Sequence, residues 1–383
     1  KPFQTIMAKS ILIIAGEPSG DLHASNLAKD LKKLKPDLKF FGLGGKLCKE
    51  AGVEIDFDIS KLSIIGLVDV WKNIFTIGKV FKDILKKVDS TNVDLAILVD
   101  YPGFNLRLAR ELSKRGIPVI YYISPQVWAW GADRIGIIKE CVTKILVFFK
   151  FEEDLYKKSG VSSEFVGNPL LETVKITLPK DEILKKYGLS NAKPVIALLP
   201  GSRAMEVKTL LKIMAGSAGI IAKGLNGAQF VVAKYKNLPI ALYEKAIKDS
   251  GHNIKIIDGD AYNILSVSDF AIVASGTATL ETAIIGTPFV ITYKVGLINY
   301  IAYKIVAKTK ILGLVNVIAR RVIVPEFLQY DATPEKIARE SLEILQDGVK
   351  RAAMISELAR VKSSLGTPGA SMRAAGAILP YLS

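Results

Sequence analysis

Short apolar runs that end in small-residue turns and continue into helical patterns recur along this 383-residue chain. The clearest lies at 195–206, VIALLPGSRAME, where an apolar strand over Val195–Leu199 breaks at Pro200-Gly201 and a helix restarts near Ser202. Strands that alternate with helices in this way predict a parallel, doubly wound α/β sheet.

Two such series are present, separated by a polar, proline-bearing passage over 175–193. We predict strands at 11–15, 40–43, 95–99, 119–123, 145–149 and 164–166, then at 195–199, 229–233, 254–257, 270–274 and 289–293. Because the chain is long for one core, we expect two Rossmann-like lobes facing a cleft, with ligands beyond the carboxyl ends of the strands. The expected domains are an N-terminal lobe (1–175), a C-terminal lobe (176–345) and C-terminal helices (346–383) that cross back over the lobes or are exchanged between subunits.

Composition narrows the classes of partner. The net charge of +15 indicates an anionic partner: a nucleotide, a phosphorylated substrate, nucleic acid or an anionic lipid surface. No apolar run approaches the roughly 18 residues of a membrane-spanning helix. The two cysteines, Cys48 and Cys141, lack metal-binding spacing and favour a reducing compartment. With only His23 and His252, a histidine metal cluster is excluded.

Gly201, Ser202 and Arg203 form a candidate diphosphate site. The first N–H groups of a helix point outward unpaired, and the helix dipole is positive there. The Arg203 guanidinium adds fork-like donors that suit phosphate oxygens. An ordinary strand-to-helix turn with a solvated arginine is an equal alternative.

A second turn of this type, ASGTATLE at 274–281, follows a later strand of the same lobe. Its small residues and hydroxyls suit a nucleotide, and Glu281 could accept hydrogen bonds from both hydroxyls of a ribose. The alternative is a plain helix start that Thr277 or Thr279 caps. Since both turns belong to one lobe, the nucleotide interpretation is favoured.

In the first lobe, Asp100 directly follows the predicted strand at 95–99 and precedes Pro102-Gly103. A carboxylate at the carboxyl end of a strand opens towards the expected cleft, so Asp100 is a candidate general base. Alternatively, Asp100 only caps its own turn. Glu17 and Ser19 lie on the neighbouring turn and could orient a sugar.

Two further stretches have competing interpretations. The aromatic-rich run at 121–130, YYISPQVWAW, suits either a sugar site or the core. Asp258-Gly259-Asp260 matches the D-x-D pattern of metal-dependent sugar transferases, but so short a pattern occurs easily by chance. We therefore assign this stretch to a structural turn.

Two segments indicate a membrane surface. The stretch at 64–87 predicts a helix with a broad apolar face and a lysine-bearing opposite face, typical of an interfacial helix, although burial against the sheet is an equal alternative. The interval from Thr282 to Pro325 has no acidic residue and carries several Lys and Arg, which suits an anionic lipid surface. Nucleic acid would suit it too, but no motif for nucleic-acid binding accompanies it.

Taken together and in order, the motifs resemble the lipid-A-disaccharide synthase family, glycosyltransferases of the two-Rossmann (GT-B) architecture. The matching segments span nearly the whole chain: AGEPSGD (15–21), IIGLVDV (64–70), DYPGFNLRLA (100–109), YYISPQVWAW (121–130), FVGNPL (165–170), LLPGSRAMEV (198–207), ASGTATLE (274–281) and VPEFLQ (324–329). The ordered set is specific although each segment alone is weak.

The resemblance implies that UDP-2,3-diacylglucosamine donates its sugar to 2,3-diacylglucosamine 1-phosphate, giving the β-1,6-linked disaccharide 1-phosphate and UDP. The donor is α-linked and the product β-linked, so one in-line displacement and one base suffice. Asp100 matches the family's proposed catalytic aspartate and would deprotonate the acceptor's 6-hydroxyl. No metal or organic cofactor is implied.

The resemblance also assigns binding residues. On the nucleotide side they are Gly201, Ser202, Arg203, Glu206, Ser275, Gly276, Thr277, Glu281 and Asn316, with Arg203 on the departing diphosphate and Glu281 on the ribose. On the acceptor side they are Gly16, Glu17, Ser19, Asn105 and Trp130. Because both substrates carry acyl chains, the expected membrane contacts are Leu67, Val68, Trp71, Ile74 and Phe75, on the cytoplasmic face of the inner membrane of a Gram-negative cell.

The chain departs from the family pattern at a few positions. Gly131 replaces a frequent basic residue, for which Arg134 could substitute, and Asn168 stands where His is usual. Lys150 replaces a frequent Pro, and Val315 replaces the usual Pro before Asn316. The alternatives are another GT-B enzyme that uses UDP-N-acetylglucosamine, as transferase or epimerase, and a non-catalytic lipid-binding relative. A homodimer exchanged through the C-terminal region also stays open.

Overall fold

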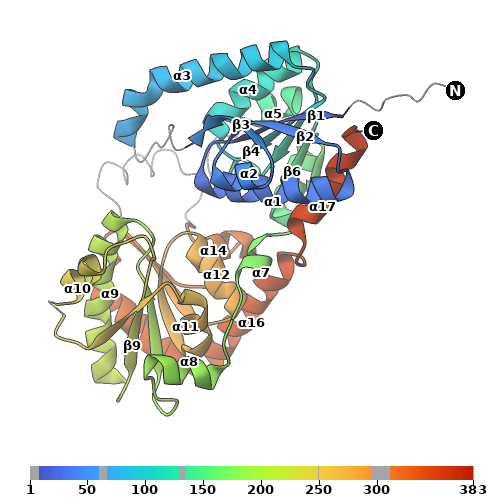
Figure 1. The fold of residues 1–383 in the computed structure, drawn as a ribbon. Helices are drawn as coiled ribbons and strands as arrows, with labels where there is room; N and C mark the ends of the chain where they lie inside the picture. The colour runs from blue at the N-terminus through green and yellow to red at the C-terminus, as the bar shows by residue number, and fades with distance from the viewer. Residues whose placement is uncertain (1–7, 60–66, 129–133, 249, 295–310, 383) are drawn as a thin grey trace. The chain divides into compact units, whose positions relative to one another are not determined.

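The computed structural model describes residues 8–59, 67–128, 134–248, 250–294 and 311–382, and no side chain between 67 and 74. It divides into two compact units, each an α/β layer structure with helices on both faces of one sheet (Figure 1). Unit 1 runs to Pro169 and resumes at Leu365, and unit 2 is Leu170–Ser364.

Unit 1 contains a seven-stranded sheet in the order β3-β2-β1-β4-β5-β6-β7, in which every pair is parallel. Its elements are β1 (Ser10–Ala15), α1 (Pro18–Leu34), β2 (Lys39–Gly44), α2 (Lys46–Glu50), β3 (Glu54–Asp58), α3 (Leu67–Ser90), β4 (Leu95–Val99), α4 (Pro102–Lys114), β5 (Val119–Tyr122), α5 (Arg134–Cys141), β6 (Lys144–Val147), α6 (Lys150–Lys158), β7 (Ser163–Phe165), α17 (Ala370–Ile378) and the 3-10 helix η2 (Leu379–Leu382).

Unit 2 contains a six-stranded parallel sheet in the order β10-β9-β8-β11-β12-β13. Its elements are α7 (Leu170–Thr173), α8 (Lys180–Tyr187), β8 (Val195–Leu199), α9 (Ala204–Gly224), β9 (Gln229–Lys234), α10 (Ile240–Lys248), β10 (Ile254–Asp258), α11 (Ala261–Val267), β11 (Phe270–Ala274), α12 (Thr277–Ile285), β12 (Phe289–Tyr293), α14 (Leu314–Ala319), β13 (Glu326–Leu328), α15 (Pro334–Gln346) and α16 (Gly348–Ser364).

The two-lobed, parallel α/β fold expected from the sequence is confirmed. The central strands are continuous apolar runs because helices cover both of their faces, and every residue of β4, β8 and β11 is buried. In each sheet the order of strands reverses beside the unit's first strand, between β1 and β4 in unit 1 and between β8 and β11 in unit 2. Ligands of doubly wound sheets bind at the carboxyl end of such a switch point.

Details differ from the sequence-based expectations. The edge strands β3 and β13 were not expected, because neither has a continuous apolar run: their sequences are EIDFD and EFL. Helix α9 begins at Ala204 rather than near Ser202, because Arg203 is still extended. The boundary between the units falls at 169/170, where the sequence analysis expected it at 175/176. Thr177, shortly after both positions, is hydrogen-bonded to Asn263 of α11 in unit 2.

The C-terminal segment does not form a separate domain. Helix α16 belongs to unit 2, whereas α17 lies beside α1 and returns the chain to unit 1 (Figure 1). Ala374, Ile378 and Leu382 are fully buried in the core of unit 1. Arg373 Nε donates to the Val166 carbonyl at 2.8 Å, and Lys35 Nζ donates to the Leu382 carbonyl at 2.8 Å.

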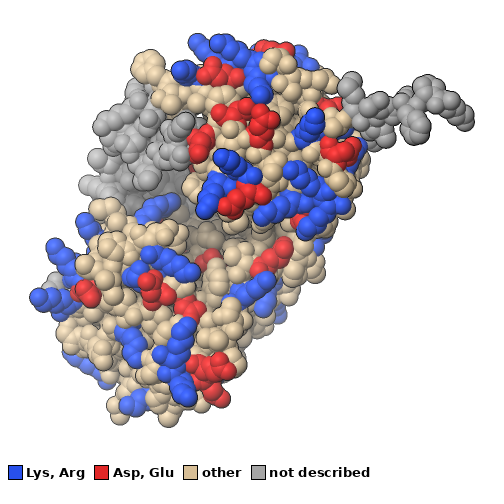
Figure 2. Space-filling model, in the orientation of Figure 1, with Lys and Arg blue, Asp and Glu red and all other residues tan. Residues whose placement is uncertain are grey.

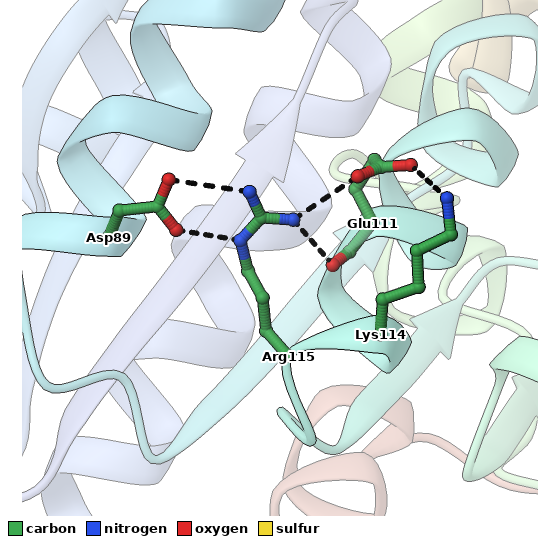
Figure 3. A network of polar contacts seen from close by, with 4 residues as sticks. All are labelled: Asp89, Glu111, Lys114 and Arg115. Carbon is green, nitrogen blue, oxygen red and sulfur yellow. Dashed lines mark hydrogen bonds and ion pairs between the residues drawn. The ribbon is translucent and has the colours of Figure 1, made fainter.

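Helix α3 is held to unit 1 at its C-terminal end. Ile84 and Val88 are buried, and Phe81 packs edge-on against Phe104 of α4. Arg115, at the end of α4, binds Asp89 of α3 through both carboxylate oxygens at 2.7 and 3.3 Å (Figure 3). The same guanidinium contacts Glu111, which also binds Lys114. Such bidentate networks fix geometry better than single surface ion pairs do.

Among the described residues, none of the helices combines the length and apolar character that crossing a bilayer requires. Figure 2 shows basic and acidic side chains interspersed over the face in view.

Candidate functional site

Unit 2 contains a cavity of about 720 Å³ at its switch point. The turns after β8 and β11 form part of its wall, because these strands are neighbours in register and their carboxyl ends lie at one edge. All eight residues predicted from these two turns line the cavity: Gly201, Ser202, Arg203, Glu206, Ser275, Gly276, Thr277 and Glu281. The structure therefore brings together both turns that the sequence singled out.

The turn after β8 depends on Gly201. Its φ of +103° is disfavoured for other residues, and a Cβ there would lie 2.4 Å from Oε2 of Glu206. Glu206 closes a capping box at the start of α9: it accepts from the Arg203 backbone N–H at 3.3 Å and from the Arg203 guanidinium at 2.9 Å. Glu206 thus holds the exposed Arg203 side chain beside the cavity.

The turn after β11 leaves the start of α12 without a side-chain cap. Gly276 occupies the N-cap position, and Thr279 Oγ1 donates to the Gly276 carbonyl instead of accepting from the helix N–H groups. The structure therefore contradicts the alternative of a helix start capped by Thr277 or Thr279. Helix N–H groups with no side-chain cap, at a cavity, can bind an anion.

Glu281 lies one turn into α12 and is held by Tyr262 of α11, whose hydroxyl donates to Oε1 at 2.9 Å. Burial raises the pKa of the Glu281 carboxyl, whereas the bond from Tyr262 lowers it. Tyr262, which also lines the cavity, was not predicted. The signal that could have found Tyr262 is its place in the first turn of α11, the helix that follows the carboxyl end of β10.

Lys234 is a second cavity residue that the sequence analysis missed. Lys234 is the last residue of β9. A lysine at the carboxyl end of an apolar strand could have been recognised from the sequence as a candidate residue of the site. Its ammonium group is buried and pairs with Asp258 at 2.9 Å while donating to the Leu238 carbonyl at 3.0 Å. It therefore stabilises the loop after β9.

The Asp258-Gly259-Asp260 stretch has structural partners. Asp258 pairs with Lys234, and Asp260 accepts from the Tyr187 hydroxyl and from Asn263 Nδ2. These contacts favour the structural turn over a metal site.

In unit 1 the switch point places Asp100 and the turn after β1 side by side, because Ala15 of β1 pairs with Val99 of β4. Asp100 and Tyr101 both have left-handed backbones, with φ of 48° and 45°. Each such non-glycine residue costs about 1 to 2 kcal/mol, so surrounding contacts must hold the turn. One is Gly16, where a Cβ would lie 2.3 Å from the Tyr101 ring.

The Asp100 carboxyl has an unusual proton affinity. Burial and the nearby Glu17 charge raise its pKa to about 6, although the Tyr101 backbone N–H opposes this. Glu17 is exposed at the start of α1, as is Ser19. An aspartate that titrates near 6 is a stronger base than an ordinary one while still ionised at neutral pH.

Asp21, the last residue of the AGEPSGD motif, has a structural role. Its carboxylate is buried and accepts from the backbone N–H groups of Gly45, Leu47 and Cys48 at 2.7 to 3.1 Å. It thereby fixes α1 against the turn after β2.

Two predicted binding residues point into the protein. Asn105 is fully buried, and its Nδ2 donates to the carbonyls of Val99 and Asp100. Asn316 is also fully buried: it donates to Val324 and Glu326 and accepts from the N–H groups of Ile323 and Val324. Partners use both ends of the Asn316 amide, whereas Asn105 uses only its amide nitrogen, and its buried Oδ1 has no hydrogen-bond partner among the described residues.

Trp130 and Gly131 lie outside the described residues, as do the side chains of Leu67, Val68, Trp71 and Ile74. Phe75 is described and is 88% exposed. In the aromatic-rich stretch, Tyr121 and Tyr122 belong to the core, and Trp128 Nε1 donates to the buried Glu152 at 3.2 Å.

Two Rossmann-like units, each with a candidate site at the switch point of its sheet, form the GT-B architecture, which glycosyltransferases share with UDP-sugar epimerases. The family described as lipid-A-disaccharide synthetase matches residues 11–374. The lipid-A-disaccharide synthases of Syntrophus aciditrophicus and Myxococcus xanthus are 41% and 39% identical, over 96% and 97% of both chains compared. The chain belongs to the lipid-A-disaccharide synthase family.

Solved structures agree on the fold. MurG of Acinetobacter baumannii has a TM-score of 0.59 at 14% identity, covering 97% of this chain and 99% of its own. The UDP-GlcNAc 2-epimerase of Neisseria meningitidis, bound to UDP-GlcNAc, has a TM-score of 0.61 at 15% identity, covering 97% of this chain and 100% of its own.

Proposed function

We propose that unit 2 binds the UDP moiety of a UDP-2,3-diacylglucosamine donor and that Asp100 of unit 1 activates the 2,3-diacylglucosamine 1-phosphate acceptor. Family membership gives the overall reaction, the glycosyl transfer that makes the lipid A disaccharide. The observation that carries the proposal is the Asp100 carboxyl, held at the switch point with its pKa raised to about 6.

In the proposed step, ionised Asp100 takes the proton from the acceptor's 6-hydroxyl as that oxygen attacks the anomeric carbon of the donor. The bond from this carbon to the diphosphate oxygen breaks, and UDP leaves with the electron pair. One displacement inverts the α-linked donor to the β-linked product. General bases typically contribute about 10² to 10⁴-fold to such a rate.

The leaving diphosphate gains negative charge, and the cavity in unit 2 has the means to stabilise it. The Arg203 guanidinium and the start of α12, which lacks a side-chain cap, both lie at this cavity. Fixed donors aimed at developing charge often supply the largest part of an enzymatic acceleration. Glu206 positions Arg203, and Glu281, held by Tyr262 through one oxygen, would accept the ribose hydroxyls with the other.

The acyl chains of both substrates require a way to a lipid surface. We assign this role to α3, whose C-terminal end is anchored on α4 while Phe75 is exposed. The protein would then lie on the cytoplasmic face of the inner membrane, attracted by its net charge of +15.

An epimerase of the same fold is the second candidate. Such an enzyme would need additional acids and histidines at its site, and this chain has only two histidines. His23 is packed edge-on against Phe148 and burial lowers its pKa to about 4, so it stays neutral. His252 packs closely against Gly219 of α9 and is not among the residues that line the cavity. Neither histidine is suited to exchange a proton with a sugar there.

The test is a radiolabelled transfer assay with both lipid substrates in detergent and EDTA, comparing wild type with Asp100→Asn. We expect a disaccharide phosphate from wild type and a loss of about 10² to 10⁴-fold in Asp100→Asn, with UDP affinity by calorimetry unchanged. Arg203→Ala should instead weaken UDP binding. Normal turnover by Asp100→Asn would remove the base assignment, and wild-type UDP affinity in Arg203→Ala would remove the diphosphate site.

A further inference from the structure

The carbonyl oxygen of Asp100 accepts two hydrogen bonds from buried side chains. The Tyr121 hydroxyl donates to it at 2.6 Å, and Asn105 Nδ2 donates at 2.8 Å. Tyr121 comes from the neighbouring strand β5 and Asn105 from the first turns of α4, so the carbonyl is fixed by two independent elements.

The Asn105 side-chain amide also restrains Val99, the residue before Asp100. Asn105 Nδ2 also donates to the Val99 carbonyl at 3.1 Å, while the Asp100 N–H donates to the Tyr122 carbonyl at 3.0 Å. Since Asn105 and Tyr121 are both fully buried, neither side chain has room to turn away. Together these bonds hold the peptide groups on both sides of the Asp100 Cα.

This restraint coincides with the strained part of the backbone. Asp100 and Tyr101 are consecutive left-handed residues, a conformation that aspartate tolerates as a single residue but that is unfavourable for tyrosine and for two residues in a row. An ordinary continuation of β4 would turn the Asp100 carboxylate elsewhere. Strained backbone at a functional position persists only when its surroundings determine it, and here the two donors do so.

We propose that Tyr121 and Asn105 form a carbonyl clamp, a pair of positioning residues that aim the Asp100 carboxylate by holding its own backbone carbonyl. The proposal rests on the assignment of Asp100 as the base. Neither clamp residue touches substrate; both act through Asp100.

The test compares Tyr121→Phe with Tyr156→Phe. Tyr156 is a matched control: it is buried in the same core cluster, and its hydroxyl donates to the Pro125 carbonyl at 3.2 Å rather than to Asp100. We expect Tyr121→Phe to lower kcat by about 10- to 100-fold, the range of misplaced catalytic groups, with the KM for both substrates and the UDP affinity within about threefold of wild type. Tyr156→Phe should keep kcat within about threefold, as removal of an uninvolved hydroxyl does.

The pH profile separates positioning from stability. In Tyr121→Phe the acid limb of kcat/KM should move down towards the ordinary pKa of aspartate, because a carboxylate released from the turn gains contact with water. A variant that is only less stable would have a lower kcat/KM at every pH, but its acid limb would stay at the wild-type pH. Asn105→Ala, which removes the other donor, should act in the same direction and carries the test if Tyr121→Phe does not fold.

Wild-type kcat and an unmoved acid limb in either folded variant would overturn the clamp. So would a loss of kcat that only follows the loss of folded protein, judged by thermal unfolding. If instead Asp100→Asn is fully active, the assignment of Asp100 as the base fails. That result differs from the two outcomes above, which concern only the clamp residues.

Discussion

Glu17 and Asp100 place two carboxyl groups at one switch point, and burial together with the negative charge of Glu17 raises the pKa of Asp100. The pKa of Asp100 is raised to about 6 first by burial and then by the Glu17 charge. The base must be ionised to act, so kcat/KM should fall as the pH drops through about 6.

Glu17→Gln should move this acid limb to lower pH. Removing a nearby negative charge makes ionised Asp100 easier to form, and burial alone then keeps the pKa above its ordinary value. The shift should be less than about one unit, because exposed charges interact by about 1 kcal/mol or less and one unit is 1.36 kcal/mol. Ser19→Ala, an uncharged change in the same turn, should leave the midpoint in place. A midpoint that rises or stays in Glu17→Gln would contradict the coupling.

At the scale of elements, helix α6 holds the segment that follows β5. Glu152, near the start of α6, is only 4% exposed and accepts from the Ser124 hydroxyl at 2.8 Å and from Trp128 Nε1 at 3.2 Å. Burial raises the Glu152 pKa to about 7, although these two donors oppose the rise.

Glu152→Gln should therefore change how stability depends on pH. The folded protein binds the Glu152 proton more tightly than the unfolded chain, so this group's stabilising contribution is complete below pH 4.5 and is lost as the pH rises through about 7. The loss is on the order of 3 kcal/mol at most. Gln keeps an acceptor for both donors and does not titrate, so the variant should lose this slope and gain on wild type at pH 8.

Urea unfolding followed by tryptophan fluorescence at pH 5 and pH 8 measures this, because all three tryptophans lie before residue 170, in the sequence of unit 1. Glu153→Gln is the matched control. Although burial opposes it, hydrogen bonds from Lys150 and Lys157 lower the Glu153 pKa, so that variant should be most destabilising at high pH. Equal pH slopes in wild type and Glu152→Gln would show that Glu152 does not titrate in this window.

Helix α3 offers a second prediction at this scale. If Phe75 enters the lipid, Phe75→Ser should reduce binding to vesicles with anionic lipid by about 10- to 100-fold, the equivalent of burying one phenylalanine side chain. Val349→Ser is the control, since Val349 is 81% exposed but lies on α16 of unit 2. Co-sedimentation measures both. Equal binding by Phe75→Ser and wild type would indicate that α3 packs on unit 1 without contacting lipid.

For the molecule as a whole, the sequence predicted the parts that are uniformly apolar. Central strands such as β4 and β8 follow from their apolar runs, and the glycine turns after β8 and β11 mark the cavity. The edge strand β3 was not predicted because it has no continuous apolar run: its two apolar residues alternate with acidic ones, as one side of an edge strand is not covered by another strand.

Side-chain direction was the part that could not be predicted. A motif identifies Asn105 and Asn316 as residues of the site, but not whether the amide faces a ligand or the backbone. That choice depends on which carbonyls the fold brings near, such as those of Val99 and Asp100 for Asn105. Nor does the amphipathic pattern of the C-terminal helices tell which unit each one covers.

The return of α17 to unit 1 leads to the last prediction. Removing residues 365–383 would expose the core positions that Ala374, Ile378 and Leu382 cover. Burying an isoleucine or leucine stabilises by about 1.5 to 3 kcal/mol each, and a domain's whole stability is about 5 to 15 kcal/mol. We therefore expect unit 1 to unfold, seen as loss of native tryptophan fluorescence, while unit 2 still binds UDP by calorimetry.

Met372→Ser, at an exposed position of the same helix, should leave both signals unchanged. Unfolding of the full-length chain also tests the exchanged dimer that the sequence leaves open. If a partner's α17 filled this place, the unfolding midpoint of the full-length chain would rise with protein concentration, because association and folding would be linked. A midpoint independent of concentration means that each chain completes its own unit 1. A truncated chain with native fluorescence and wild-type unfolding would show instead that α17 is dispensable to that core.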